Sequence, residues 1–391
     1  MKKVLILGGS HRDIPLIKAC KELAYFVITL GDRDYYLGHK YADQYYKINF
    51  NDLTKIKEIV KNEEIDYLIP GSGEESYLNT VKLSEELNMG HFDSLKTANL
   101  VHNKWRFKEF CLENNISVPK GVYVTSSSDI TNLNDMNFPI VIKPTNLSGG
   151  RGVEVVHTLK DLQSSLKVTE KVSNEIFLEE YIEGELIAYS IILKEQDIIY
   201  DFIASDKTYL NPYLITSAFP KKLDKKVVKH IHTEVTKLAK LLSLSNGMFH
   251  LQILIKENIP YIIDVTRRIP GDFFPDLMEL ADGVEYNKAV IQGYTTGNLN
   301  ANLLKNTKQN FIIRHCVMPS ENGIYENIVI DESIKNNIIS VFDLLDKGYI
   351  IKDYLHTQIA IVFIKLNKYN ETVLDNINNL IKVSVKTTHD K

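Results

Sequence analysis

The stretch FPIVIKPTNLSGGRGVEVV, residues 138–156, joins a short apolar run to a loop rich in glycine. Residues 139–142 favour a strand, and Lys143 stands at the end of this run. Valine returns at positions 153, 155 and 156, directly after Gly152, so a second strand is expected there. The glycines therefore join two strands, whereas phosphate-binding glycine loops usually open a helix.

Two interpretations of this loop are open. Because glycine has no Cβ, a loop between strands can fold over a nucleotide and bring its backbone close to the ligand's oxygen atoms. An ordinary surface hairpin would have the same composition. The neighbouring motifs have to decide between a nucleotide flap and a hairpin.

The composition limits the class of protein. At 391 residues the chain is too long for one compact core, so two or three domains are expected. The formal net charge of −4 argues against a nucleic-acid partner that is held by a basic surface. No run approaches the roughly 20 apolar residues that span a bilayer, so no membrane partner is expected. The N-terminal VLILGG is too short for a signal-peptide core, which leaves a cytoplasmic location as the expectation.

The three cysteines carry no visible pattern. Cys20, Cys111 and Cys316 stand far apart in the chain, without the paired spacing of a zinc site or a disulfide framework. We therefore expect them to be buried and chemically inert.

The N-terminal part alternates strands with helices. KKVLILGG, YFVITL and IDYLIPGSG are short apolar runs, and helical spacing separates the first two. This order predicts an open parallel α/β domain over residues 1–100. Its ligands would bind at the carboxyl ends of the strands, near Gly8, Gly9 and GSGEES. A dinucleotide fold is the rival, since Asp32 and Asp34 end the second strand, but GGSHRD lacks the third glycine of GxGxxG.

The rest of the chain divides into two further units. Residues 103–116 predict a charged amphipathic helix, and helical patterns recur at 161–172 and 225–243, with the strand-like IFLEEYI and AYSIIL between them. A third unit begins at residue 305 and combines the strand-like FIIRHCV and HTQIAIVFIKL with a helix at 371–381. The predicted fold class is therefore α/β and α+β, with units at 1–100, 101–304 and 305–391.

Four features follow one another along the chain: Lys104, then Lys143 with SGGRG, then EEYIEGE at 179–185, then HLQILIKENIPYIIDVTRRIPGD at 250–272. Together they resemble the ATP-grasp superfamily, in particular its carboxylate–amine ligases, such as the L-amino acid ligases, and the related biotin carboxylases. The resemblance covers nearly the whole chain, and the order and spacing of the motifs are its specific part. It implies a three-domain architecture, with the ATP-grasp domain at 101–304 and a flap subdomain at about 119–182.

The resemblance also implies which residues contact ATP. Lys104 and Lys143 would hold the phosphates, although a lysine at a strand edge can also simply reach to water. A glutamate of the EEYI segment would accept from the adenine amino group, and Glu185 would bind the ribose. Glu185 departs from the family's spacing, which often has the glutamate where Leu186 stands, so an exposed strand end is the alternative. The implied set is Lys104, Lys143, Ser148, Gly149, Gly150, Gly152, Glu179, Glu180, Tyr181, Ile182 and Glu185.

A metal site follows from the geometry of residues 250–266. Two strand-like runs flank KENIP, and a turn centred on Asn258 would place Gln252 opposite Asp264 and His250 opposite Thr266. Oxygen ligands of this kind suit a Mg²⁺ ion, or a Mn²⁺ ion, that bridges ATP phosphates. The family usually has two glutamates and an asparagine at the positions of Gln252, Asp264 and Thr266, so one negative charge is missing. Gln252 is alternatively a bystander, because an amide is a poorer ligand than a carboxylate.

Arg268 is the expected catalytic cation, together with Lys143. Spacing by two puts Arg268 on the same strand face as Asp264 and Thr266, where it would face the transferred phosphoryl group and the substrate carboxylate. A surface ion pair with Asp272 or Asp276 is the alternative. Arg267 points to the opposite face and could be the structural arginine of the two.

The best interpretation is an ADP-forming ligase that phosphorylates a carboxylate to an acyl phosphate, which an amine then attacks. Its partners would be a small carboxylate and a small amine, and relatives often form homodimers. Two alternatives remain at this stage. One is a carboxylase-type relative that activates bicarbonate, and the other is a nucleotide-binding protein without turnover, which the altered metal ligands would explain.

Overall fold

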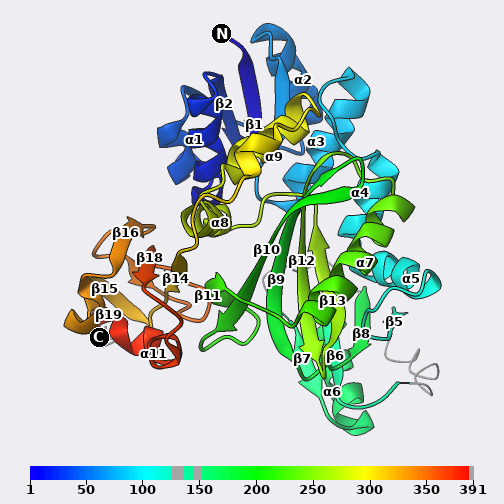
Figure 1. Cartoon of the computed structure of the whole chain (residues 1–391), viewed down its shortest axis with the longest axis vertical. Coiled ribbons are helices and arrows are strands. Elements are labelled where there is room, and N and C mark those ends of the chain that lie inside the picture. Colours follow the sequence, from blue (N-terminus) through cyan, green and yellow to red (C-terminus); the bar gives the residue numbers. More distant parts are fainter. Residues whose placement is uncertain (126–135, 145–151, 174, 387–391) are drawn as a thin grey trace.

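The computed structural model describes residues 1–125, 136–144, 152–173 and 175–386. Its N-terminal unit is built on a four-stranded sheet in the order β3-β2-β1-β4, in which the three strand pairs are parallel. Alternate residues of β1 face opposite sides, so Val4 and Ile6 pack toward α1 and α9, while Leu5 and Leu7 pack toward α2 (Figure 1). The elements are β1 Lys3–Leu7, α1 Ile14–Glu22, β2 Phe26–Gly31, β3 Gln44–Lys47, α2 Leu53–Asn62, β4 Tyr67–Pro70 and α3 Glu74–Leu87.

Two short helices lead out of this unit into a small antiparallel sheet. Strands β6 and β7 are consecutive and antiparallel, with Ile140 opposite Val156, so the prediction that the glycine loop joins two strands is confirmed. The strand order is β5-β8-β6-β7. The elements are α4 Leu95–His102, α5 Lys104–Glu113, β5 Gly121–Val124, β6 Ile140–Pro144, β7 Glu154–Val156, α6 Leu159–Thr169 and β8 Ile176–Glu180.

The largest sheet has eight strands in the order β13-β12-β9-β10-β11-β14-β18-β16. Odd-numbered residues of β9, such as Tyr189 and Ile191, pack with α7 on one face, while Ala188 and Ile192 pack with α8 and α9 on the other (Figure 1). The elements are β9 Glu185–Lys194, β10 Asp197–Thr208, β11 Ile215–Pro220, α7 Lys225–Leu241, β12 Gly247–Lys256, β13 Ile259–Thr266, α8 Phe274–Asp282, α9 Tyr286–Thr295, β14 Phe311–Val317, β16 Ile338–Asp343 and β18 Ala360–Leu366.

The C-terminal part adds a three-stranded sheet in the order β17-β15-β19, with helix α11 beside it. Because β14 pairs with β11, the large sheet continues across residue 304, where the sequence suggests a boundary. The remaining elements are β15 Gly323–Ile330, α10 Glu332–Lys335, β17 Ile350–Ile351, α11 Glu371–Leu380 and β19 Ile381–Lys386.

The mixed α/β and α+β fold class predicted from the sequence is confirmed. Helix ends differ by a few residues where a capping side chain decides them. The side chain of Thr158 accepts from the backbone N–H of Asp161, so α6 begins at Leu159 and not at Asp161. Cys20, Cys111 and Cys316 are free and buried, as predicted. Within the described residues, no helix has the length and the apolar content that crossing a bilayer requires.

A buried ion pair ties the N-terminal unit to the large sheet. The Nε of Arg267 lies 2.7 Å from Oδ2 of Asp93, and both side chains are almost fully buried. The same guanidinium donates to the carbonyl oxygens of Ser245, at 2.7 Å, and Met248. Tyr77 also donates to Asp93, at 3.1 Å. Arg267 is therefore a structural residue, in agreement with its predicted face.

We predict that Arg267→Met lowers the free energy of unfolding by roughly 3–5 kcal/mol, because it leaves the Asp93 carboxylate buried without its partner. Urea unfolding followed by circular dichroism measures the change. The exposed Arg33→Met is the control and should stay within about 0.5 kcal/mol. Equal stability of the two variants would contradict a structural role for Arg267.

Candidate active site

The predicted pairing of the β12–β13 hairpin is confirmed. Gln252 lies opposite Asp264, and His250 lies opposite Thr266. A register shift follows Gln252, where one extra residue of β13 is accommodated. Asp264 is partly exposed, and its Oδ1 accepts from the backbone N–H of Val265 at 3.0 Å. The expected oxygen ligands Gln252 and Asp264 therefore lie side by side on neighbouring strands.

Arg268 lies two residues beyond the end of β13. Its backbone N–H donates to Oγ1 of Thr266 at 3.2 Å, and its Nη1 donates to the carbonyl oxygen of Ile269 at 3.2 Å. Its Nε is buried and has no hydrogen-bond partner among the described residues. Burial lowers the pKa of the guanidinium, while the charges of Glu74 and Asp264 act in the opposite direction. A buried N–H without a partner indicates a site that a ligand can complete.

The alternative ion pair of Arg268 with an aspartate of the following loop is not formed within the described residues. Asp272 instead pairs with Arg12, at 3.1 Å, and with His11, at 3.6 Å. Asp276 lies near Asn287, whose Nδ2 donates to it at 3.4 Å. The guanidinium of Arg268 therefore forms no ion pair with these two carboxylates among the described residues.

Glu74, the first residue of α3, links Arg268 with Lys104. Burial alone would raise the pKa of Glu74, but His102, Arg268 and Lys104 lower it, and the net shift is downward. The Nδ1 of His102 lies 3.8 Å from Oε1 of Glu74. Lys104 begins α5 and Arg268 follows β13, so the charges of two cations that are distant in the sequence act on the same carboxylate.

The carboxylate of Glu179, on β8 of the small sheet, contacts the ammonium groups of two lysines. Lys143 on β6 and Lys108 on α5 both place their Nζ against its carboxylate, and Glu179 and Lys108 are buried. The side chain of Lys143 is 20% exposed, but its ammonium is paired with Glu179. It therefore does not simply reach to water. Burial lowers the pKa of Lys108 to about 8, although Glu179 opposes this shift. Lys108 was missed from the sequence, yet it stands one helical turn from Lys104 and on the same face.

The other residues of the expected adenine segment are placed around the end of β8. The side chain of Glu180 accepts from the backbone N–H and the Nδ2 of Asn137, at 3.0 and 3.1 Å. The backbone N–H of Glu180 donates to the backbone carbonyl oxygen of Lys120 at 2.9 Å. The backbone N–H of Tyr181 donates to that of Pro139, also at 2.9 Å. Tyr181 is 43% exposed, and Ile182 lies between β8 and β9. This segment is thus fixed by β-type contacts to its neighbours.

Two further predicted residues lie at the margins of this arrangement. Glu185 begins β9 and pairs with Lys221, with 2.8 Å between Oε1 and Nζ. Gly152 precedes β7 and has a φ of 70°, a conformation that favours glycine. Ser148, Gly149 and Gly150 lie outside the described residues.

A row of polar residues crosses one face of the large sheet. Register places Gln252 of β12 beside Ala188, Ala188 beside Ala204, Asp206 beside Ala218, and Ala218 beside Arg314 of β14. Directly opposite residues share a face, and so do residues two apart on a strand. Asp264, Gln252, Asp206 and Arg314 therefore line the same face, with alanines between them.

The far end of this row is strongly charged. Arg314 is 2% exposed, and its Nη1 donates to the backbone carbonyl of Asp272 at 3.2 Å. Burial would raise the pKa of Asp272, but Arg12, His11 and Arg314 together hold it well below its usual range. Burial raises the pKa of Asp206 to about 7, against the effects of Arg314 and Gln252. Asp206 and Arg314 were not predicted, although an arginine inside the apolar run FIIRHCV was a visible signal, and Asp272 was named only as an alternative partner of Arg268.

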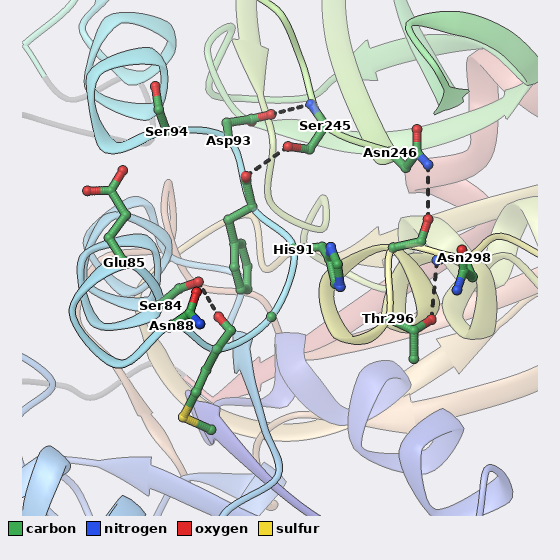
Figure 2. Close-up of a pocket in the computed structure, with 14 residues that line it drawn as sticks. Ser84, Glu85, Asn88, His91, Asp93, Ser94, Ser245, Asn246, Thr296 and Asn298 are labelled. Carbon is green, nitrogen blue, oxygen red and sulfur yellow. Dashed lines mark hydrogen bonds between the residues drawn. The ribbon is translucent and has the colours of Figure 1, made fainter.

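Two pockets lie at the borders of the N-terminal unit. The larger, about 490 Å³, is lined by residues 84–85, 88–94, 245–246 and 296–298 (Figure 2). Its polar groups bind one another: the N–H of Ser245 donates to Asp93 at 2.7 Å, and Nδ2 of Asn246 donates to Gly297 at 2.9 Å (Figure 2). We interpret it as a structural junction. The second pocket, about 410 Å³, lies at the carboxyl ends of β1 and β4, where the sequence predicts ligands.

Residues 121–292 match the family model described as the D-ala D-ala ligase C-terminus. This match agrees with the order of motifs in the sequence, which resembles the ATP-grasp superfamily.

Solved structures share the fold over nearly the whole chain. An L-amino acid ligase from Bacillus licheniformis aligns with a TM-score of 0.83 and 17% identity, covering 99% of each chain. The phosphoribosylglycinamide synthetase from Anaerococcus prevotii gives a TM-score of 0.78 and 20% identity, with 98% and 100% covered. Biotin carboxylase from Campylobacter jejuni gives 0.74 and 18%, with 99% and 92% covered. At these identities the likeness establishes the fold.

Curated relatives are longer than this chain. The carbamoyl phosphate synthase large chain of Saccharolobus solfataricus is 23% identical over 294 residues, which are 68% of this chain and 27% of that protein. A large chain from Clostridium botulinum is 23% identical over 286 residues, with the same coverage. The chain thus matches about a quarter of the length of these relatives.

The lowered pKa of Lys108 predicts a pH dependence of stability. The ordinary lysine pKa is 10.5, so between about pH 8 and 10.5 the unfolded chain binds more protons at this residue than the folded chain. The cost of burying the charge is therefore fully present below pH 8 and is relieved as the pH rises. Relative to Lys108→Met, the free energy of unfolding of the wild-type chain should rise by on the order of 3 kcal/mol between about pH 8 and 10.5.

Urea unfolding of both proteins at closely spaced pH values measures this gain. The stability difference between them should be flat from pH 6.5 to 7.5, which serves as the internal control. A difference that also stays flat up to pH 10 would show that Lys108 keeps an ordinary pKa.

Proposed function

We propose that this chain is an ATP-dependent, ADP-forming ligase that activates a carboxylate as an acyl phosphate and joins it to an amine. The observation that carries the proposal is the pair of lysines, Lys108 and Lys143, that contact the single buried carboxylate of Glu179. Machinery of this kind matches attack on a terminal phosphoryl group. The fold likeness to an L-amino acid ligase supports the same reaction class.

The residues present fit a nucleotide. The Nε of Arg268 is buried without a partner, and Lys143 and Lys108 share a single carboxylate, so the site holds cationic groups that an anionic ligand can pair. Bound ATP supplies the phosphoryl group that turns the acid into a good acyl donor. Lys104 and Lys143 would contact the phosphates, and the EEYI segment would contact the adenine.

The residues also fit a magnesium ion that is bound together with a nucleotide. Gln252, Asp264 and Thr266 offer oxygen atoms, but only Asp264 carries charge. Among the described residues, no group of three or more His, Cys, Asp or Glu side chains could hold a metal ion. Mg²⁺ or Mn²⁺ would therefore bind chiefly together with the nucleotide, whose oxygens complete the coordination.

The chain's own side chains would act by position and charge. Arg268 would hold the carboxylate of the acid and stabilise the negative charge that develops during phosphoryl transfer. Arg314 and Arg12, which flank Asp272, would orient the acid from the other side. The amine then displaces phosphate without any covalent bond to the protein, so proximity supplies much of the acceleration.

We predict that Lys143→Ala and Asp264→Ala each abolish formation of ADP, because the first removes a phosphate contact and the second removes the only charged metal ligand of the set. A coupled assay of ADP and phosphate release measures this loss. Lys120→Ala and Asp197→Ala, two exposed residues of the same regions, are matched controls and should keep normal rates. Near-normal turnover of the Lys143 or Asp264 variant, or release of AMP and pyrophosphate, would overturn the assignment.

We predict that hydroxylamine replaces the natural amine, because a small nucleophile needs no amine pocket. Hydroxamate should form with ATP, Mg²⁺ and the correct acid, and Arg268→Ala should reduce its rate on the order of 10² to 10³-fold. Nucleotide binding, followed by a fluorescent ATP analogue, should survive the change.

The same assay separates the alternatives. A carboxylase would release ADP with bicarbonate and give no acid-dependent hydroxamate. A nucleotide-binding protein without turnover would release no ADP with any acid. Full hydroxamate yield in Arg268→Ala would remove Arg268 from the catalytic residues.

A further inference from the structure

The pocket of about 410 Å³ at the end of the N-terminal sheet has an apolar outer part. Tyr35, Tyr36, Leu37 and Phe50 line it from the N-terminal unit, and Leu344 and Leu345 reach it from the C-terminal part. Tyr35 is 72% exposed, and the others are partly exposed. Aromatic and aliphatic side chains that stay open to solvent around a concavity suit an apolar ligand group.

The inner end of the pocket adjoins the candidate active site. His11 and Arg12 line it, and Arg12 donates from Nε to Oδ1 of Asp272 at 3.1 Å. The Arg12 side chain also lies against Gly271, where a Cβ would be 3.2 Å from its Cδ. Its charge acts on Arg268 as well. A ligand in the pocket would therefore present its inner end to His11 and Arg12, which line it.

The remaining lining has little capacity for a second charged group. Among the described lining residues, the side chains that can carry a charge near neutral pH are those of His11, Arg12 and Asp13. Asp13 already accepts from the N–H and the Oγ of Ser10, both at 2.9 Å, and from the N–H of Ser72 at 2.7 Å. With Arg12 shared with Asp272, no cluster of free cations is left for a phosphate. The lining disfavours a phosphorylated substrate.

We propose that this pocket holds the uncharged apolar body, aromatic or branched, of the carboxylic acid substrate. The carboxylate of this acid faces Arg12, while the aromatic and leucine side chains cover its body. This inference rests on the proposed ligase function, because it specifies the acid on which that function acts. It also makes a statement about binding that can be tested without turnover.

The test uses 3-phenylpropionate, acetate and 3-phosphoglycerate as probes. Leu344→Trp fills the pocket, and Val341→Trp on the same segment is the matched control, because Val341 is 41% exposed and does not line the pocket. Tyr35→Asp is a second variant that should fold normally, since Tyr35 is mostly exposed. Circular dichroism checks the fold of each protein.

Binding of each acid without nucleotide is measured by saturation-transfer nuclear magnetic resonance and calorimetry. The wild-type chain should bind 3-phenylpropionate at least about tenfold more tightly than acetate or 3-phosphoglycerate. Leu344→Trp and Tyr35→Asp should each weaken its binding by about tenfold, and Val341→Trp should not. Tighter binding of 3-phosphoglycerate, or unchanged 3-phenylpropionate binding in both pocket variants, would overturn the proposal.

The hydroxamate assay then separates this inference from the function on which it rests. Binding of 3-phenylpropionate in the pocket without ADP release from any acid would reject the ligase and keep the apolar pocket. Hydroxamate formation that is insensitive to both pocket variants would keep the ligase and reject the pocket.

Discussion

The buried ion pair between Asp93 and Arg267 is the interaction on which the site depends. Arg267 and Arg268 are neighbours in the sequence, so near the end of a strand their side chains leave in opposite directions. Arg267 is held by Asp93 and by two backbone carbonyls. This fixes the backbone of the neighbouring Arg268, on which the charges of Glu74 and Asp264 act. A cation with an unpartnered buried N–H can be kept in place because its neighbour carries the structural contacts.

Charge in the small sheet follows a similar division. Glu179 is one carboxylate between two ammonium groups, so the cluster carries a net positive charge in a buried place. Burial opposes that charge, which is why the pKa of Lys108 is lowered, whereas Lys143 stays partly exposed. An anion that approached Lys143 would relieve the imbalance.

The sequence was sufficient for features that depend on local spacing. The turn at KENIP gave the pairing of Gln252 with Asp264, and the valines after Gly152 gave strand β7. Lys108 and Arg314 were missed, because their environment comes from segments that are distant in the sequence. The nucleotide, metal and catalytic roles of the predicted site residues and the bounds of the three domains stay predictions. Ser148, Gly149 and Gly150 could not be compared, since they lie outside the described residues.

The large eight-stranded sheet and the small four-stranded sheet differ in how they are connected to the rest of the chain. Strand β14 makes the C-terminal part continuous with the eight-stranded sheet, so these two parts form one hydrogen-bonded body. In the described part of the chain, the β5-β8-β6-β7 sheet shares no strand with that body. Helix α5 packs on the large sheet through Phe107 and Cys111, while its Lys108 binds Glu179 of the small one. Helix α5 therefore ties the two sheets together, through the buried ion pair of Lys108 with Glu179 and through the stacking of Trp105 on Tyr123 of β5.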